Sequence, residues 1–395
     1  MVYICIVSIK LHGHFMIYLH RVLESQVKQH LKFFPVVGIT GPRQSGKSTL
    51  LQHLLVDYRY VTFDDHEVLM FFYNDPKKFM RVYNNKVIFD EVQNVPEIFN
   101  AIKLAVDCDR DNYGKFVLIG SSQFAFLKKV SESLAGRIAL LSLLPLQYSE
   151  MPEALREECI FRGGYPELVD RAYQLSGSWY SSYMDTYLNK DLRKISHIDQ
   201  IRDFQRLIEL LAANTSQILN MSHYARKIGV TVKTIKEWIS VLEASYIIFL
   251  LPPFYNNLGK RIIKSPKVYF YDTGLVSYLT GIKTKELFEK GPMSGSLFEN
   301  YIVSEIMKKN LHQKSDANLY FYRTSRGLEI DLIVDYKTHK EWIEIKAGET
   351  YRQASLEPME NLMEPKDTSY LLYRGAPVPY LDNIKVINYQ EYLDR

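Results

Sequence analysis

The residues whose chemistry is most readily recognised lie in one glycine-rich segment, residues 41–49. The segment contains Gly41, Pro42, Arg43, Gln44, Ser45, Gly46, Lys47, Ser48 and Thr49, and its first eight residues match the pattern G-x-x-x-x-G-K-[ST]. Glycines let the backbone bend so that successive N–H groups point at phosphate oxygens, and a helix that begins near Lys47 would add the positive end of its dipole. Lys47 would reach the β- and γ-phosphates, and the Ser48 hydroxyl would complete a magnesium shell. We therefore expect a phosphate-binding loop (P-loop) that holds ATP and Mg²⁺.

A second candidate group is the acidic pair Asp90 and Glu91, which follows the apolar run 86–89. Asp90 would hold the magnesium ion through its water shell, and Glu91 would polarise the water that attacks the γ-phosphate. Two adjacent acids after a strand can instead cap the next helix. Because a P-loop is present, we favour the first interpretation, which predicts hydrolysis of ATP rather than binding alone.

Two further positions are candidates for catalysis. Ser121 follows the apolar run 116–119 and, with Ser122 as the alternative, could sense the γ-phosphate. Serines after a buried strand also serve as turn or cap residues. Arg137 is a candidate cation for the transition state, either in cis or in trans from a neighbouring subunit. The alternative for Arg137 is an ordinary surface arginine, and a role in trans would require an oligomer.

These candidate groups need a sheet that brings them together. Short apolar runs of strand length precede the P-loop and recur along the chain, at 36–39, 60–63, 86–89, 116–119 and 138–143. Runs that are apolar on both faces suit a parallel sheet covered by helices, and the segments between them are long enough for helices. We therefore expect an α/β P-loop fold, a parallel sheet with helices on both faces.

A helix-turn-helix pattern occupies the middle of the chain. Ser222 can cap a helix to Ile228, Gly229 supplies a turn, and Thr231 can cap a second helix over 232–242. Two apolar runs that could form the strands of a wing follow, at 246–251 and 268–271.

Positive charge is concentrated in this region, because residues 215–264 contain seven Lys or Arg against two Glu, a net charge of +5. The residues placed to face DNA phosphates and groove edges are Thr231, Lys233, Thr234 and Lys236. A winged helix can also be a rigid subdomain without DNA contact, so both interpretations stay open.

Alternating polar and apolar residues predict a β-hairpin over 328–335 and 342–346. With a side-chain period of two, one face would carry the charged residues and the other would be apolar. The charged set is Glu329, Asp331, Asp335, Glu344 and Lys346, and the apolar set is Ile330, Leu332, Val334, Ile343 and Ile345. One interpretation is an ordinary amphipathic hairpin whose charges lie in water.

The other interpretation is a nuclease site. Asp331, Glu344 and Lys346 resemble the D…E-x-K signature of PD-(D/E)XK nuclease folds, with Glu299 as a fourth acid from a helix. In such a site, carboxylates would hold magnesium and the lysine would orient the attacking water. The motif is short, and a nuclease-like fold can be kept without activity.

The order of four motifs resembles that of bacterial and archaeal AAA-superfamily ATPases with a C-terminal domain of unknown function. These motifs are 41–48, 90–93, 120–122 and 134–137, and the resemblance continues through 161–166, 271–275 and 344–346. It covers nearly the whole chain except residues 1–15. The resemblance implies that the P-loop and the acidic pair bind and hydrolyse ATP.

Length and composition limit the remaining possibilities. A chain of 395 residues suggests two to four domains, and 49 Lys and Arg against 45 Asp and Glu leave a net charge of only +4. Any nucleic-acid surface must therefore be local. Three widely spaced cysteines indicate neither a disulfide framework nor a zinc site, and no run is long enough to span a membrane. We expect a cytoplasmic protein that does not bind membranes.

The expected organisation has five parts. They are an extension (1–15), a P-loop AAA-type ATPase domain (16–150), a helical linker or lid (151–215), a winged-helix-like region (216–285) and a PD-(D/E)XK nuclease-like domain (286–395). The expected function is Mg-dependent ATP hydrolysis that drives a switch acting on DNA. The alternatives are an ATP-gated, metal-dependent nuclease and a nucleotide-gated regulator that binds DNA or a protein without cutting strands.

Overall fold

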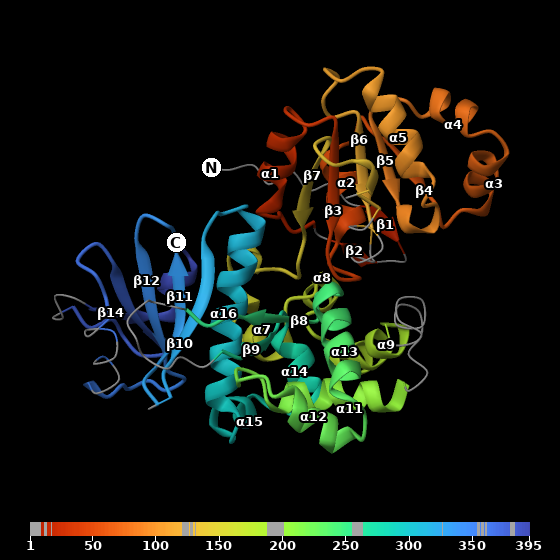
Figure 1. The fold of residues 1–395 in the computed structure, drawn as a ribbon. Coiled ribbons are helices and arrows are strands. Elements are labelled where there is room, and N and C mark those ends of the chain that lie inside the picture. The colour runs from red at the N-terminus through yellow and green to blue at the C-terminus, as the bar shows by residue number, and fades with distance from the viewer. Residues whose placement is uncertain are drawn as a thin grey trace.

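Three regions follow one another along the chain in the computed structural model (Figure 1). A sheet with covering helices comes first, a helical region follows, and a second sheet ends the chain, with the long helix α16 (Ser294–His312) between the last two. The structure describes residues 9–11, 14–16, 18–120, 126, 129–130, 132–187, 201–254, 264–325, 327–353, 356, 359, 362–379 and 384–395.

The first sheet is the predicted five-stranded parallel sheet. Its strands are β3 (Val36–Thr40), β4 (Arg59–Thr62), β5 (Val87–Asp90), β6 (Phe116–Ile119) and β7 (Ile138–Ser142), in the order β4-β5-β6-β3-β7. Alternate residues of the central strands enter different cores, because Val36 and Leu118 pack on one face while Val37 and Val117 pack on the other. The covering helices are α1 (Leu23–His30), α2 (Lys47–Leu54), α3 (His66–Asn74), α4 (Pro76–Val82) and α5 (Ile98–Asp107). The α/β P-loop fold is therefore confirmed.

The helical region begins after a short 3-10 turn, η2 (Tyr148–Glu150). Its helices are α7 (Arg156–Arg162), α8 (Pro166–Asp170), α9 (Ser176–Tyr187), α11 (Ile201–Ala213), α12 (Met221–Ile228), α13 (Val232–Ala244), α14 (Thr273–Leu279) and α15 (Lys285–Lys290). The strands β8 (Ile248–Leu251) and β9 (Lys267–Phe270) follow α13 and pair with each other in antiparallel fashion. Gly229 has φ +89° between α12 and α13, as a tight turn requires.

The helix caps agree with the sequence prediction at one position and differ at the other. The Thr231 side chain accepts a hydrogen bond from the Thr234 N–H and caps α13, as expected. At the start of α12, however, the side chain of Asn220 rather than that of Ser222 accepts the capping bond from the His223 N–H. The capping residue lies two positions earlier than predicted, and asparagine is as good a cap as serine.

The C-terminal sheet is mixed. Its strands are β10 (Asn318–Arg323), β11 (Glu329–Asp335), β12 (Lys340–Ile345), β13 (Thr368–Tyr373) and β14 (Ile384–Asn388), paired in chain order, and α18 (Tyr389–Leu393) ends the chain. The pairs β10-β11 and β11-β12 are antiparallel, so the predicted hairpin is present, and the other two pairs are parallel.

One face of the hairpin differs from the prediction. The pairing of β10 with β11 shifts register between Tyr320 and Tyr322, so that Ile333 and Ile330 are their respective partners. This bulge reverses the alternation of side chains along β11. Ile330 and Ile333 therefore lie in one core, while Leu332 lies in the core on the other side. The strict alternation predicted for residues 328–335 is wrong at this point.

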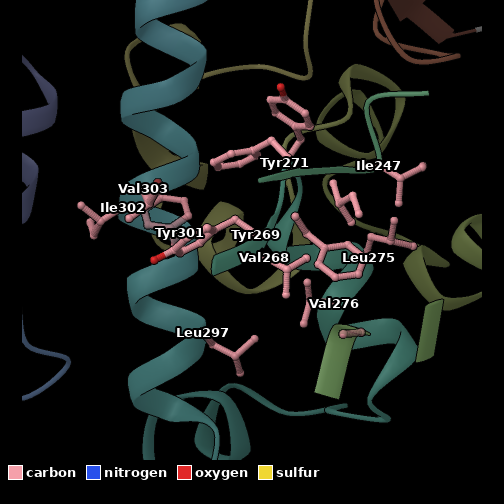
Figure 2. Packing of buried hydrophobic residues seen from close by; sticks show 14 of the residues in the cluster. Ile247, Val268, Tyr269, Tyr271, Leu275, Val276, Leu297, Tyr301, Ile302 and Val303 are labelled. Atoms are coloured by element: carbon pink, nitrogen blue, oxygen red, sulfur yellow. The ribbon is translucent and has the colours of Figure 1, made fainter. Parts of the chain in front are cut away.

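The largest hydrophobic core runs continuously from Leu144 to Leu393. Figure 2 shows side chains of β9, α14 and α16 gathered in it, among them Tyr269, Val276 and Leu297. The boundaries expected at 215 and 285 therefore do not separate independent cores. Strands β1 (Ile9–Leu11) and β2 (His14–Met16) pair with each other in a separate two-stranded sheet. Among the described helices, none combines the length and hydropathy that a membrane crossing requires.

Candidate functional site

The P-loop connects the carboxyl end of β3 to the first turn of α2. Gly41 has φ +143°, and a Cβ atom there would lie 2.0 Å from the carbonyl oxygen of Leu143 at the end of β7. Gly46 has φ +90° and immediately precedes Lys47, the first residue of α2. Glycine is required at both positions, at the first by a close approach of two backbones and at the second by backbone conformation.

The side chain of Lys47 is buried against the loop itself. Its Nζ donates hydrogen bonds to the carbonyl oxygens of Gly41 at 2.9 Å and Pro42 at 2.7 Å. The ammonium is therefore fixed at the mouth of the loop, where the pattern requires a cation for the phosphates. The Ser45 hydroxyl, also buried in the loop, has no hydrogen-bond partner among the described residues. A buried hydroxyl that has no partner among the described residues fits a site that is completed by an anionic ligand.

The acidic pair lies where the sequence predicted it. The Ser48 hydroxyl donates a hydrogen bond to Asp90 Oδ2 at 2.7 Å, which joins the start of α2 to the end of β5. The Glu91 N–H donates to the other carboxylate oxygen of Asp90 at 2.8 Å, and the Gln93 amide donates to the Glu91 carboxylate. Ser48 and Asp90 are oxygen ligands of the type that magnesium prefers, and their hydrogen bond holds them together.

Tyr60 is a residue of this site that sequence reasoning missed. Its hydroxyl donates a hydrogen bond to Asp90 Oδ2, the same oxygen that receives the Ser48 hydroxyl. Burial, followed by the bond to Asp90, raises the pKa of Tyr60 above its ordinary value, so the phenol stays protonated. Tyr60 lies in the apolar run that became β4, and only the pairing of β4 with β5 brings its side chain to the acid.

One predicted catalytic position, Arg137, lies at the opposite edge of the sheet. Arg137 immediately precedes β7 at the amino edge of the sheet, where its guanidinium donates two hydrogen bonds to Asp107, at 2.8 and 3.0 Å. The P-loop follows the carboxyl edge, about 16 Å away along a five-residue strand. Strand direction therefore separates Arg137 from the loop in the same chain, and its catalytic role stays a prediction. Ser121 and Ser122 lie outside the described residues.

The predicted DNA-contact residues surround the start of α13. Thr231, Lys233 and Lys236 are exposed, and Thr234 is half-buried. The hydroxyls of the two threonines are 2.9 Å apart and form part of the helix cap. Arg226 and Lys227 on α12 are also exposed. Four cations therefore lie on the surface of the two helices, while Lys260 and Arg261 fall outside the described residues.

The C-terminal acidic residues form a cluster around a lysine that was not predicted. Lys267 of β9 is 2% exposed, and its Nζ lies 2.9 Å from Glu299, 2.7 Å from Glu329 and 3.9 Å from Asp331. The Tyr269 hydroxyl donates to Glu299 at 2.6 Å. Burial raises the pKa of Glu299 to about 7, against the opposing effect of Lys267.

The other residues of the nuclease-like motif are adjacent to this cluster. Asp331 Oδ2 accepts a hydrogen bond from the Ile345 N–H at 2.9 Å, and Lys346 pairs with Glu344 at 2.5 Å. Burial, and then the charge of Asp331, raises the pKa of Glu344. Within the described part of the chain, no group of three or more Asp, Glu, His or Cys side chains is arranged to hold a metal ion. The cation in contact with these carboxylates is an ammonium group of the protein.

Three stretches of the chain match three different protein families. Residues 34–152 match a family described as an AAA domain. Residues 153–286 and 294–392 match two domains of unknown function, DUF8612 and DUF4143. The first match contains the P-loop and the acidic pair, and the third contains the acidic cluster except for Lys267.

Similar proteins are found in bacteria and archaea. The chain is 28% identical over 328 residues to the uncharacterized protein Rv2008c of Mycobacterium tuberculosis, covering 82% of this chain and 73% of the relative. It is 22% identical over 375 residues to the uncharacterized protein MJ1544 of Methanocaldococcus jannaschii, with 82% and 78% covered. A solved structure, the Walker-type ATPase PABY2304 of Pyrococcus abyssi, matches with a TM-score of 0.43 and 14% identity, covering 65% of this chain and 94% of that one. Residues 34–152 of this chain are therefore similar to AAA domains.

Proposed function

We propose that the protein is a Mg-dependent ATPase in which hydrolysis drives a switch that acts on DNA. The observation that carries the proposal is the hydrogen bond from Ser48 to Asp90, made beside a loop that already holds Lys47 at its mouth. Nucleotide binding needs the loop, whereas hydrolysis also needs the acids. Both sets of groups meet at the carboxyl edge of one sheet.

Each residue of the site has a distinct role in this proposal. The amides of residues 41–49 and the Lys47 ammonium bind the phosphates, and Ser48 and Asp90 hold Mg²⁺, which offsets negative charge on the phosphates. Glu91 accepts a proton from the attacking water. Arg137 would have to act in trans, from the amino edge of a neighbouring subunit, and this role requires an oligomer.

The test is the rate of phosphate release with Mg·ATP, measured alone and with double-stranded DNA, single-stranded DNA or RNA. We expect Lys47→Ala to lose hydrolysis by about 100-fold or more, because it removes a cation from the developing charge. Lys77→Ala, an exposed lysine of α4, is the matched control and should match wild type. Hydrolysis by Lys47→Ala at the wild-type rate would overturn the proposal.

DNA is the proposed partner because four exposed cations lie on α12 and α13. The net charge of the whole chain is too small for general attraction to nucleic acid, so binding would be confined to this surface. Stimulation by one polymer in the ATPase assay would identify the partner class. A nucleotide-dependent change in affinity for DNA or for a protein, without stimulation of hydrolysis, would favour the regulator instead.

A nuclease remains a second candidate because Asp331, Glu344 and Lys346 lie together on neighbouring strands. The carboxylates of this site would have to release the Lys267 ammonium before they could bind a metal ion. Breaking these buried ion pairs costs free energy that an ordinary metal site does not lose. Asp331→Ala and Lys346→Ala should abolish metal-dependent cleavage if it exists. Intact DNA and RNA after incubation with wild-type protein, ATP and Mg²⁺ or Mn²⁺ would exclude this candidate.

A further inference from the structure

The segment that follows β7, residues 143–148, runs along α16. Buried hydrogen bonds join the segment to the helix. His312 Nε2 accepts from the Leu144 N–H at 3.0 Å. Lys308 Nζ donates to the Leu146 carbonyl at 3.2 Å, and Glu305 accepts from the Tyr148 N–H at 2.6 Å. Residues 305, 308 and 312 share one face of a helix, whereas Leu144 and Leu146 lie in the chain after β7 and Tyr148 begins η2. The segment is therefore attached to the helix along its length.

The same segment is attached on its other side to the P-loop. Arg21, whose side chain is 4% exposed, donates from Nη1 to the Ser45 carbonyl at 2.9 Å and from Nη2 to the Leu144 carbonyl at 2.7 Å. Its Nε lies 3.0 Å from Glu150 Oε2. One guanidinium thus bridges the P-loop, the segment after β7 and a buried carboxylate.

Gln147 closes the connection between Arg21 and α16. Glu150 Oε2 accepts from the Gln147 N–H at 2.9 Å, and the Gln147 side-chain oxygen lies 2.8 Å from His312 Nδ1. Because His312 Nε2 accepts from Leu144, Nδ1 carries the proton and donates to Gln147. The side chains that make this connection, those of Arg21, Gln147, Glu150 and His312, are all buried.

We propose that α16 of the C-terminal region positions the P-loop, through His312, Glu150 and Arg21. Arg21 is a positioning residue, since it contacts the backbone of the loop and not the ligand side of Lys47. A P-loop binds phosphate with backbone amides, so a shift of the Ser45 carbonyl moves the donors themselves. The C-terminal region then helps to hold the P-loop in its geometry. The part of the inference that concerns ATP binding rests on the proposed function.

The primary test is amide hydrogen exchange of residues 41–48 in the nucleotide-free protein. His312→Leu removes both hydrogen bonds of the ring, and Arg21→Lys keeps the charge but cannot bridge two carbonyls. Both variants should exchange about tenfold faster at 41–48, with the rest of the parallel sheet unchanged. His312→Gln, which retains an acceptor for the Leu144 N–H, should recover most of the protection. Lys314→Ala is the control, because this exposed lysine binds the Leu140 carbonyl from the surface.

The second measurement is the affinity for a fluorescent ATP analogue with Mg²⁺. We expect His312→Leu and Arg21→Lys to weaken binding by about tenfold, because small displacements of binding groups are costly. Should His312→Leu fail to fold, Arg21→Lys decides the outcome. If the amides of residues 41–48 exchange at the wild-type rate in the folded variants, the inference is wrong. If wild-type protein protects its P-loop but binds no nucleotide, the proposed function is wrong and the positioning role is not.

Discussion

The Tyr246 hydroxyl lies 2.8 Å from Thr40 Oγ1, which joins the chain just after α13 to the strand that precedes the P-loop. Thr40 is the last residue of β3, and Tyr246 follows the end of α13 by two residues. The same hydroxyl is 2.9 Å from Ser142 Oγ at the end of β7. The ends of two neighbouring strands, β3 and β7, therefore share one buried hydroxyl with the chain just after α13. A change in the loop has a direct physical path to α13.

The first prediction concerns the stability that this contact contributes. Tyr246→Phe removes a hydroxyl that both Thr40 and Ser142 contact inside the protein. We expect the free energy of unfolding to fall by about 1–2 kcal/mol, the usual cost of leaving buried polar groups underpaired. Urea denaturation followed by circular dichroism measures the change. Tyr113→Phe, at a tyrosine that is 48% exposed, should shift stability by less than about 0.5 kcal/mol. Equal effects of the two substitutions would contradict the role given to Tyr246.

The second prediction is a pH dependence that originates at Glu299. Burial raises its pKa to about 7 in the folded protein, from an ordinary value of 4.5. Between these values the folded state binds more protons than the unfolded state, so stability is greatest below about pH 4.5 and falls as pH rises through 7. Glu299→Gln is neutral at every pH and should lose less stability from pH 5 to pH 8 than wild type.

The difference between wild type and Glu299→Gln should be on the order of 2 kcal/mol, since one pKa unit corresponds to about 1.4 kcal/mol. Urea midpoints measured at several pH values provide the comparison. Glu153→Gln, an exposed glutamate, is the control and should follow the wild-type curve. Parallel curves for wild type and Glu299→Gln would rule out Glu299 as the origin of the effect.

The parallel sheet and the nucleotide site could be predicted because their signals are local. Each strand is a continuous apolar run, and the glycines and Lys47 of the P-loop lie within eight residues. Once the strands are parallel, their carboxyl ends meet at one edge, which is why Ser48 and Asp90 come together. The same reasoning places Arg137, which precedes its strand, at the opposite edge. The position of Arg137 before its strand therefore favours a role in trans over one in cis.

Arg21 and Lys267 could not be predicted, because their partners are distant in the chain and follow no pattern. Arg21 contacts Leu144 and Glu150, and Lys267 contacts Glu299. A lone cation is usually a surface residue, and only the tertiary fold removes it from water. The face of Ile330 was missed for another reason, since a bulge changes the side-chain alternation without leaving a mark in the sequence.

The third prediction tests the role of Tyr60 at the acidic pair. Its hydroxyl orients the Asp90 oxygen that also receives Ser48, so Tyr60→Phe should leave that carboxylate less well fixed. We expect the Mg²⁺ concentration for half-maximal ATP hydrolysis to rise about tenfold, as for other residues that orient a metal ligand, with little change at saturating Mg²⁺. Tyr58→Phe is a matched control, because its hydroxyl binds the Gly114 carbonyl, away from Asp90. An unchanged Mg²⁺ requirement in Tyr60→Phe would show that the bond to Asp90 has no such role.

The fourth prediction concerns the proposed DNA surface. Lys233 and Lys236 are exposed at the start of α13, where a recognition helix would contact phosphates. Each substitution to alanine should weaken duplex binding and reduce the slope of log affinity against log salt by about 0.9, the effect of one lost phosphate contact. Fluorescence anisotropy with a labelled duplex at several salt concentrations measures both quantities. Lys77→Ala on α4 should leave the slope at its wild-type value. If the slopes of Lys233→Ala and Lys236→Ala also stay at that value, DNA does not bind at this face of α13, because loss of a contacted phosphate must reduce counterion release.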